Sequence, residues 1–129
     1  MKKVKILNTK ISEITLSQTA EILTSSKGKT VAVCNANSLV RSYRDKEINS
    51  ILNSFNLALP DGFPVAKASS MLYKNKQRRV DGFNIFNETI KKGLDNDTSH
   101  YFYGNSEEVI LKLITKLETD YPEVNISGY

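Results

Sequence analysis

The chain has 129 residues, of which 40% are hydrophobic and 25% are charged, values near the average for globular domains. This composition excludes an intrinsically disordered chain, and the length suits one domain with its own core. Lysine and arginine (18) exceed aspartate and glutamate (14), for a net charge of +4; this mildly basic balance fits anionic ligands or an anionic membrane surface but is too weak to indicate nucleic acid.

Cysteine content and the length of apolar runs predict the compartment. Cys34 is the only cysteine, so no internal disulfide can form and nothing indicates an oxidising environment. No apolar segment approaches the roughly 18 residues that a membrane-spanning helix needs. The basic start, residues 1–7, lacks the apolar core and cleavage site of a signal peptide. We therefore expect a cytoplasmic protein.

Short apolar runs that predict strands alternate with helical stripes along the chain. Strands are predicted over residues 3–7, 30–34, 55–59, 100–103 and 124–126, with a further extended piece at 11–14. Helices are predicted to follow Ser17, Ser38, Asp45, Phe63, Asn84 and Asn105. This alternation predicts βαβ units, and hence one α/β domain over residues 1–129 with a Rossmann-like, mostly parallel sheet flanked by helices. The uninterrupted run 30–34 predicts a strand that is covered on both faces.

Local signals predict where several helices begin and end. Ser17 is expected to cap the first helix, and Gly28 is expected in the left-handed conformation just past its end. The segment 91–93, Lys-Lys-Gly, is expected to end the helix that follows Asn84. Asn105 and Glu108 stand at capping-box spacing before the last helix.

The segment 58–64, Ala-Leu-Pro-Asp-Gly-Phe-Pro, predicts a strand that stops, a tight turn and a helix with proline near its first position. Loops outside the carboxyl ends of strands bind ligands in α/β proteins. Asp61 is therefore a candidate acid for chemistry. The alternative, which the local sequence alone favours, is a turn residue or helix N-cap.

Polar residues also follow two other predicted strands. These are Asn35 and Asn37 after the second strand, and Gly104 and Asn105 after the fourth. Amide side chains can bind sugar hydroxyls or a nucleotide base, and the Gly104-Asn105 backbone could receive a phosphate at a helix N-terminus. Asn35 or Asn37 could equally be a cap of the following helix.

Other charged and polar residues give weaker signals. The basic run Lys74, Lys76, Arg78 and Arg79 is either a solvated loop or a contact for a diphosphate or acidic lipid headgroups. Arg79 stands out because arginine suits bidentate recognition of oxyanions. His100 has no cysteine or histidine at ligand spacing, so neither a metal site nor a Ser-His-Asp triad is predicted.

An ordered set of motifs runs through essentially the whole chain. The segments are 31–40 (VAVCNANSLV), 44–45 (RD), Asn49, 58–65 (ALPDGFPV), 79–82 (RVDG), 101–104 (YFYG) and 121–126 (YPEVNI). Together they resemble the WecG/TagA/CpsF family of bacterial glycosyltransferases, which includes N-acetylmannosaminyltransferases of wall teichoic acid and enterobacterial common antigen synthesis. The order of the set, and not any one block, makes the resemblance specific.

The resemblance implies an inverting glycosyltransferase of bacterial cell-surface polysaccharide synthesis. It would move N-acetylmannosamine or a related hexose from a UDP-sugar to a polyprenyl-diphosphate-linked acceptor, without a metal or other cofactor, as a peripheral protein at the inner face of the cell membrane. Asp61 would be the general base that takes the proton of the acceptor hydroxyl. Asn35 would line the pocket, and Arg79 would lie near a phosphate or the acceptor.

The chain also departs from the family pattern. Val33 stands where many members carry Thr, and Asn84 stands where many carry Asp. Members are longer chains whose second half supplies much of the UDP site, and here the last predicted strand runs into Gly128-Tyr129, where a loop toward the ligand face would be expected to begin. An alternative function is therefore kept: a non-catalytic binding or assembly module that pairs with another chain, as a homo-oligomer or with a different partner. A nucleic-acid role is not expected, because only Tyr73 adjoins the basic run.

Overall fold

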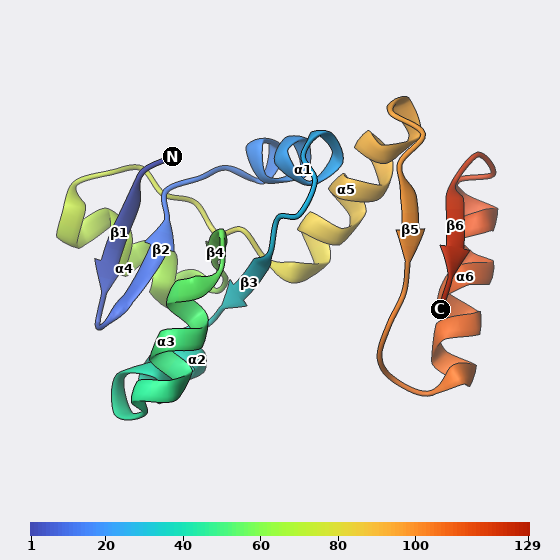
Figure 1. The fold of residues 1–129 in the computed structure, drawn as a ribbon. Helices are drawn as coiled ribbons and strands as arrows, with labels where there is room; N and C mark the ends of the chain where they lie inside the picture. The colour runs from blue at the N-terminus through green and yellow to red at the C-terminus, as the bar shows by residue number, and fades with distance from the viewer.

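The computed structural model describes residues 1–129 as six short strands and six helices that alternate along the chain (Figure 1). The elements are β1 (Lys3–Ile6), β2 (Thr9–Ser12), α1 (Leu16–Ser25), β3 (Val31–Cys34), α2 (Ala36–Arg44), α3 (Lys46–Ser54), β4 (Leu57–Pro60), α4 (Phe63–Tyr73), α5 (Gly82–Asp95), β5 (Ser99–Tyr101), α6 (Glu107–Asp120) and β6 (Asn125–Gly128). The α/β class is confirmed, and every predicted strand and helix is present with shifts at its ends.

The strands form three two-stranded sheets and not one continuous sheet. β1 pairs with β2 antiparallel, whereas β3 pairs with β4 and β5 with β6 in parallel. Mostly parallel pairing is thus confirmed, but the pairs are separate. The Ser12 side chain explains why β2 and β4 do not pair. Its hydroxyl accepts the backbone N–H of Ala58 at 3.1 Å, so this side chain occupies the edge of β4 where backbone hydrogen bonds to β2 would otherwise form.

β4 is the central strand of the N-terminal part and is buried along its whole length. Ala58 belongs to one core cluster, between the β1–β2 hairpin, β3, α2 and α4. Leu57 and Leu59 belong to a second cluster, which α1 and α5 close. Because successive side chains of a strand point to opposite faces, β4 contributes to both clusters. The segment that follows β4 therefore begins at a strand that is held in place by both core clusters.

β3 is covered on one face only, which corrects the expectation that this strand is buried on both sides. Ala32 and Cys34 are buried in the first cluster, whereas Val33 is 41% exposed. The second cluster reaches Val31 at the start of the strand but does not reach Val33. The strand that is buried on both faces is β4.

The N-cap of α1 is Thr15, and the prediction of Ser17 is wrong. Thr15 and Gln18 form a capping box, in which the threonine hydroxyl accepts the Gln18 backbone N–H and the Gln18 side chain accepts that of Thr15. Gly28 has φ +67°, so the predicted left-handed conformation is confirmed, although the helix already ends at the Ser26 cap.

The predicted end of α5 and the predicted start of α6 also need correction. α5 continues through Gly93 to Asp95, because Gly93 is a buried position against which the His100 ring packs. A glycine within a helix can allow a neighbouring side chain to pack closely against the backbone, and it does not always mark the end of the helix. The N-cap of α6 is Ser106, one residue after the predicted Asn105.

β5, α6 and β6 form a separate unit on the right of Figure 1, joined to the rest through α5. The Phe86 and Phe102 rings lie 5.9 Å apart, and the His100 ring stacks on Phe102. Burial lowers the pKa of His100, as expected for an imidazole held neutral in apolar surroundings. No helix in the structure combines the length and the apolar character that crossing a membrane requires.

Candidate functional site

The carboxyl ends of β3 and β4 meet at one edge, because these strands are parallel and Cys34 is in register with Pro60. The backbone N–H of Asp61 donates to the Cys34 carbonyl at 3.0 Å. This bond fixes the turn after β4 against the end of β3. Asn35 and Asp61, the first residues after the two strands, therefore stand at the same edge.

The Asp61 carboxylate does not cap α4, the helix that follows the turn after β4. Gly62, with φ +82°, is the N-cap of α4, and no side chain caps this helix. Only glycine adopts such a backbone conformation without strain, and Pro64 then pre-sets the first turn. The Asp61 side chain is 23% exposed. The interpretation of Asp61 as a helix cap is therefore excluded.

Arg79 lies beside Asp61 although the two residues are far apart in sequence. The Val80 N–H donates to the Pro60 carbonyl at 3.0 Å, which lays the segment before α5 along the end of β4. Arg79 Nε then lies 3.4 Å from Asp61 Oδ1 and 3.6 Å from Asp81 Oδ2. Because the Arg79 side chain is 56% exposed, guanidinium N–H groups remain available for an oxyanion.

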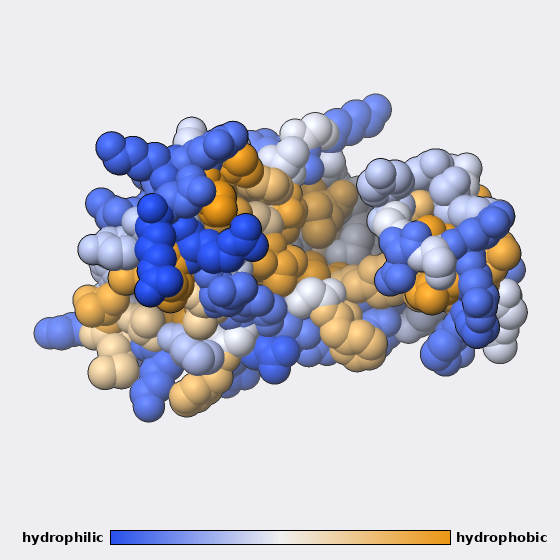
Figure 2. Space-filling model, turned by 90° about the horizontal axis from the view of Figure 1, so that it is seen from below, coloured by the Kyte–Doolittle hydropathy of each residue, from blue (hydrophilic) through white to orange (hydrophobic).

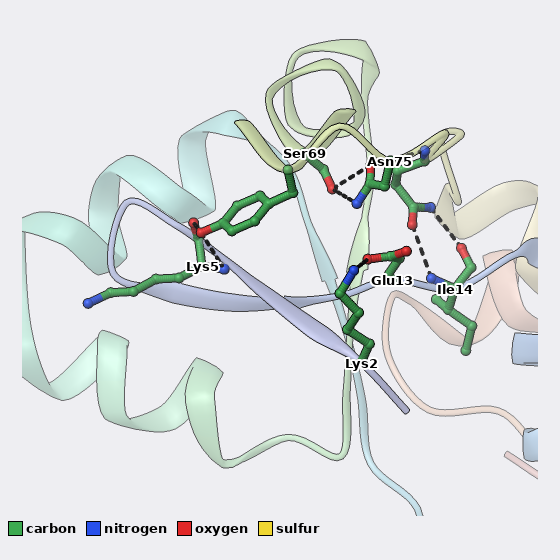
Figure 3. A network of polar contacts seen from close by, with 8 residues as sticks. Lys2, Lys5, Glu13, Ile14, Ser69 and Asn75 are labelled. Atoms are coloured by element: carbon green, nitrogen blue, oxygen red, sulfur yellow. Dashed lines mark hydrogen bonds and ion pairs between the residues drawn. The ribbon is translucent and has the colours of Figure 1, made fainter. Parts of the chain in front are cut away.

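The loop that carries Arg79 is fixed to the segment between β2 and α1 and to α4 (Figure 3). Gln77 accepts the Ile14 backbone N–H at 3.0 Å and donates to the Ile14 carbonyl at 2.7 Å. Asn75 donates to Ser69 Oγ at 3.1 Å. These hydrogen bonds hold the loop, and therefore the backbone of Arg79, in a defined position.

Asp81 is the residue of this cluster that the sequence interpretation missed. It is 6% exposed and caps α5: its Oδ1 accepts the Asn84 backbone N–H at 3.0 Å, and its Oδ2 accepts the Asn84 side-chain amide at 2.7 Å. These two bonds, in that order, lower the pKa of Asp81, and the Arg79 charge adds to the effect. An aspartate directly before a predicted helix is a capping signal, and it could have identified this residue.

Asn35 is the N-cap of α2, so the capping interpretation of this residue is confirmed. Its Oδ1 accepts the Ser38 backbone N–H at 2.9 Å and also the Ser38 hydroxyl at 2.9 Å. The side-chain Nδ2 donates no hydrogen bond within the protein, and the residue is exposed. Only the Oδ1 atom of the Asn35 amide therefore takes part in the cap. Asn37 lies in the first turn of α2 and is exposed as well.

Gly104 and Asn105 are not brought to this cluster. Both have positive φ, +120° and +61°, and lie in the loop between β5 and α6. β3 and β5 both run downward in Figure 1, so the segments that follow them lie on the side seen in Figure 2. There a hollow separates the β5–α6–β6 unit from the main body, and no hydrogen bond or ion pair joins Gly104 or Asn105 to Asp61 or Arg79.

Cys34 forms the buried floor beneath this edge. The side chain is fully buried, and burial together with the nearby Asp61 charge raises the pKa of the thiol to about 11. The thiol is therefore neutral at physiological pH and belongs to the core. A hollow of about 730 Å³ lies beside Arg79, between residues 13–18 and residues 76–80, and neither Asn35 nor Asp61 lines it.

The sequence comparisons agree with the motifs at this edge. The model of the glycosyl transferase WecG/TagA/CpsF family matches residues 4–129. The chain is 26% identical over 102 residues to an N-acetylglucosaminyldiphosphoundecaprenol N-acetyl-β-D-mannosaminyltransferase of Bacillus subtilis (strain 168), and these residues are 79% of this chain and 40% of the relative. It is 27% identical over 107 residues to the protein of the same name from Bacillus spizizenii (strain ATCC 23059 / NRRL B-14472 / W23), with 83% and 42% covered.

The chain therefore spans about two-fifths of the length of the curated relatives that it matches. The matched part includes the three neighbouring site residues Asn35, Asp61 and Arg79, together with the strands that position them. The match covers nearly the whole of this chain. From the motifs, their order and this match, the chain belongs to the glycosyl transferase WecG/TagA/CpsF family.

Proposed function

We propose that the protein takes part in the inverting transfer of a sugar from a UDP-sugar donor to a polyprenyl-diphosphate-linked acceptor, with Asp61 as the general base. The family and the names of the two relatives support the reaction class and the acceptor class. The observation that carries the role of Asp61 is its place: a carboxylate at the end of the central strand, partly exposed and not used as a cap.

In the proposed step, the acceptor hydroxyl attacks the anomeric carbon of the donor sugar. Asp61 takes the hydroxyl proton as the new C–O bond forms. The bond from the anomeric carbon to the diphosphate breaks, and UDP leaves with the electron pair. Attack on the face opposite the leaving group inverts the configuration at this carbon. The step needs no metal ion in this proposal, and the donor is the only cosubstrate.

The neighbouring residues have supporting roles in the proposal. Arg79 contacts the Asp61 carboxylate through Nε and has further N–H groups with which to bind diphosphate oxygens. In the proposal, the Nδ2 group of Asn35, whose Oδ1 caps α2, donates to a sugar hydroxyl. Asn37, Gly104 and Asn105 are proposed as more distant substrate contacts. A Rossmann-like arrangement of the mostly parallel strands stays a prediction.

The second candidate function is a non-catalytic assembly module. One edge of β3 has no strand partner, and Val33 is exposed beside it, so another chain could pair at this edge. This candidate predicts a stable complex and no transfer by the 129-residue chain.

A transfer assay separates the two candidates. The purified chain is incubated with UDP-N-acetylmannosamine and a polyprenyl-diphosphate-linked N-acetylglucosamine, and the lipid product is detected by mass spectrometry. We expect a lipid-linked disaccharide, whose anomeric configuration NMR shows to be inverted relative to the donor, and a rate that excess EDTA does not change. Absence of product, with a native mass above that of one chain, would instead support the assembly module.

A further inference from the structure

Helix α4 and the loop after it form the most one-sidedly charged segment of the chain. Residues 62–80 contain no aspartate or glutamate and five cationic residues, namely Lys67, Lys74, Lys76, Arg78 and Arg79. Of these five, only Arg79 takes part in an ion pair within the protein. The other four charges face solvent without a carboxylate partner. The segment therefore presents a concentrated positive charge.

The same segment exposes large apolar side chains. Phe63 and Met71 are each 70% exposed and Leu72 is 65% exposed, whereas the opposite side of α4 is buried in the core. Phe63, Lys67 and Met71 follow one another at intervals of four residues, so they share one side of the helix. The Lys67 ammonium lies 5.3 Å from the centre of the Phe63 ring. Along the left margin of Figure 2, the side on which α4 lies in Figure 1, apolar and charged atoms alternate.

The structure holds these side chains outward. The Tyr73 hydroxyl at the end of α4 donates to the Lys5 carbonyl at 2.6 Å and accepts the Lys5 N–H at 3.1 Å. Bonds from Asn75 and Gln77 fix the following loop to α4 and to the segment between β2 and α1 (Figure 3). The exposed residues therefore stand on a braced helix, on the side of the molecule opposite to the β5–α6–β6 unit (Figure 1).

Both ends of the segment return to the candidate site. α4 begins two residues after Asp61, and the loop ends at Arg79, which contacts Asp61. A surface on this segment is therefore continuous with the site. Exposed apolar residues within a basic rim are unusual on a monomeric protein surface and fit the boundary between lipid headgroups and acyl chains.

We propose that this surface, made by Phe63, Lys67, Met71, Leu72, Lys74 and Lys76 and termed the α4 face, docks on an anionic lipid bilayer. The cations meet the lipid phosphates, and the apolar side chains enter the headgroup boundary. Docking places Asp61 at the membrane surface, where a polyprenyl-linked acceptor resides. The proposal rests on the proposed function, since a lipid-linked acceptor explains why the protein would bind a membrane. Lipid binding itself requires neither the donor nor the acceptor.

The first test measures binding of the 129-residue chain to vesicles by co-sedimentation. We expect binding to vesicles of phosphatidylglycerol and phosphatidylcholine in equal parts, weakening as salt rises, and little binding to phosphatidylcholine alone. The double variants Met71→Gln/Leu72→Gln and Lys74→Gln/Lys76→Gln each lower the partition coefficient at least about tenfold.

Matched controls remove the same groups elsewhere. Lys27→Gln/Lys29→Gln lowers the charge equally, in the exposed segment between α1 and β3. Val109→Gln/Leu111→Gln removes two exposed apolar side chains from α6. Both controls keep binding within about twofold of the wild type, since they lie off the docking surface.

A second test locates the contact directly. The chain has no tryptophan, so one introduced tryptophan is a unique fluorophore. We expect the emission of Leu72→Trp to shift to shorter wavelength on addition of phosphatidylglycerol vesicles, and that of Leu111→Trp on α6 to stay unchanged. Equal shifts at both positions, unaltered binding in both α4-face variants, a dimer formed through this face, or no binding to anionic vesicles would each overturn the proposal. Transfer activity is scored separately, so failure of the catalytic proposal would be recognised independently.

Discussion

Asp61 and Asp81 show how local backbone geometry assigns different roles to two carboxylates that contact the same arginine. Asp81 is nearly buried, and its two oxygens accept bonds from Asn84, so it serves as the cap of α5. Asp61 precedes a glycine that takes the capping position, so its oxygens contact only Arg79. A chemical role is therefore open to Asp61, whereas Asp81 positions the segment that carries Arg79.

Replacement of Asp81 separates its capping role from its charge. Asp81→Ala removes both oxygens, and we expect a loss of about 1–2 kcal/mol in the free energy of unfolding. Asp81→Asn keeps an oxygen that can accept the Asn84 N–H, so its loss at neutral pH is smaller. Urea denaturation followed by circular dichroism measures both. Equal losses in the two variants would show that the charge, and not the cap, stabilises the helix.

The same carboxylate gives a pH dependence of defined sign. The pKa of Asp81 is lowered in the folded protein, so the unfolded chain binds a proton first as pH falls. Its contribution is fully present above the ordinary aspartate pKa of about 3.9 and is lost as pH falls through the folded-state value. Between pH 6 and pH 3, we expect the wild type to lose more stability than Asp81→Asn does. Parallel curves for the two proteins would contradict this assignment.

At the scale of elements, local patterns predicted the strands and helices but not all of their ends. Ends depend on which neighbour accepts a bond or packs closely: Thr15 displaces Ser17 as a cap, and the His100 ring keeps Gly93 inside α5. For Asn35 the sequence left a cap and a site residue open, and the structure confirms the cap. These details follow from tertiary contacts that a linear pattern does not contain.

Two glycines of α5 form a matched pair for testing this packing. A Cβ on Gly93 would lie 2.8 Å from His100 Nε2, whereas a Cβ on Gly82 would meet its nearest atom at 3.8 Å. We therefore expect Gly93→Ala to destabilise the protein by about 1–3 kcal/mol. Gly82→Ala is neutral or stabilising by up to about 1 kcal/mol, since alanine favours the helix. Thermal unfolding measures both, and a neutral Gly93→Ala would show that the His100 ring does not pack there.

At the scale of the whole molecule, the sequence predicted the α/β class, and it placed Asn35 and Asp61 after strands. It could not predict that Arg79 contacts Asp61, because that contact depends on the Val80–Pro60 bond between distant segments. Local patterns also could not predict that the strands form three separate sheets, since strand pairing depends on non-local contacts such as the Ser12–Ala58 bond at the edge of β4. The separation of Gly104 and Asn105 from Asp61 follows from the same pairing, because β5 joins β6.

The most direct measurement of the central claim compares Asp61→Asn with the wild type in sugar transfer and in UDP-sugar binding. The amide keeps the shape of the side chain but cannot accept the acceptor proton, so we expect the transfer rate to fall at least about 100-fold. Binding of the UDP-sugar, measured by calorimetry, stays within about threefold, because the base acts on the acceptor. Glu123→Gln, which neutralises an exposed carboxylate before β6, is the matched control and keeps wild-type transfer. Wild-type turnover by Asp61→Asn would contradict the account.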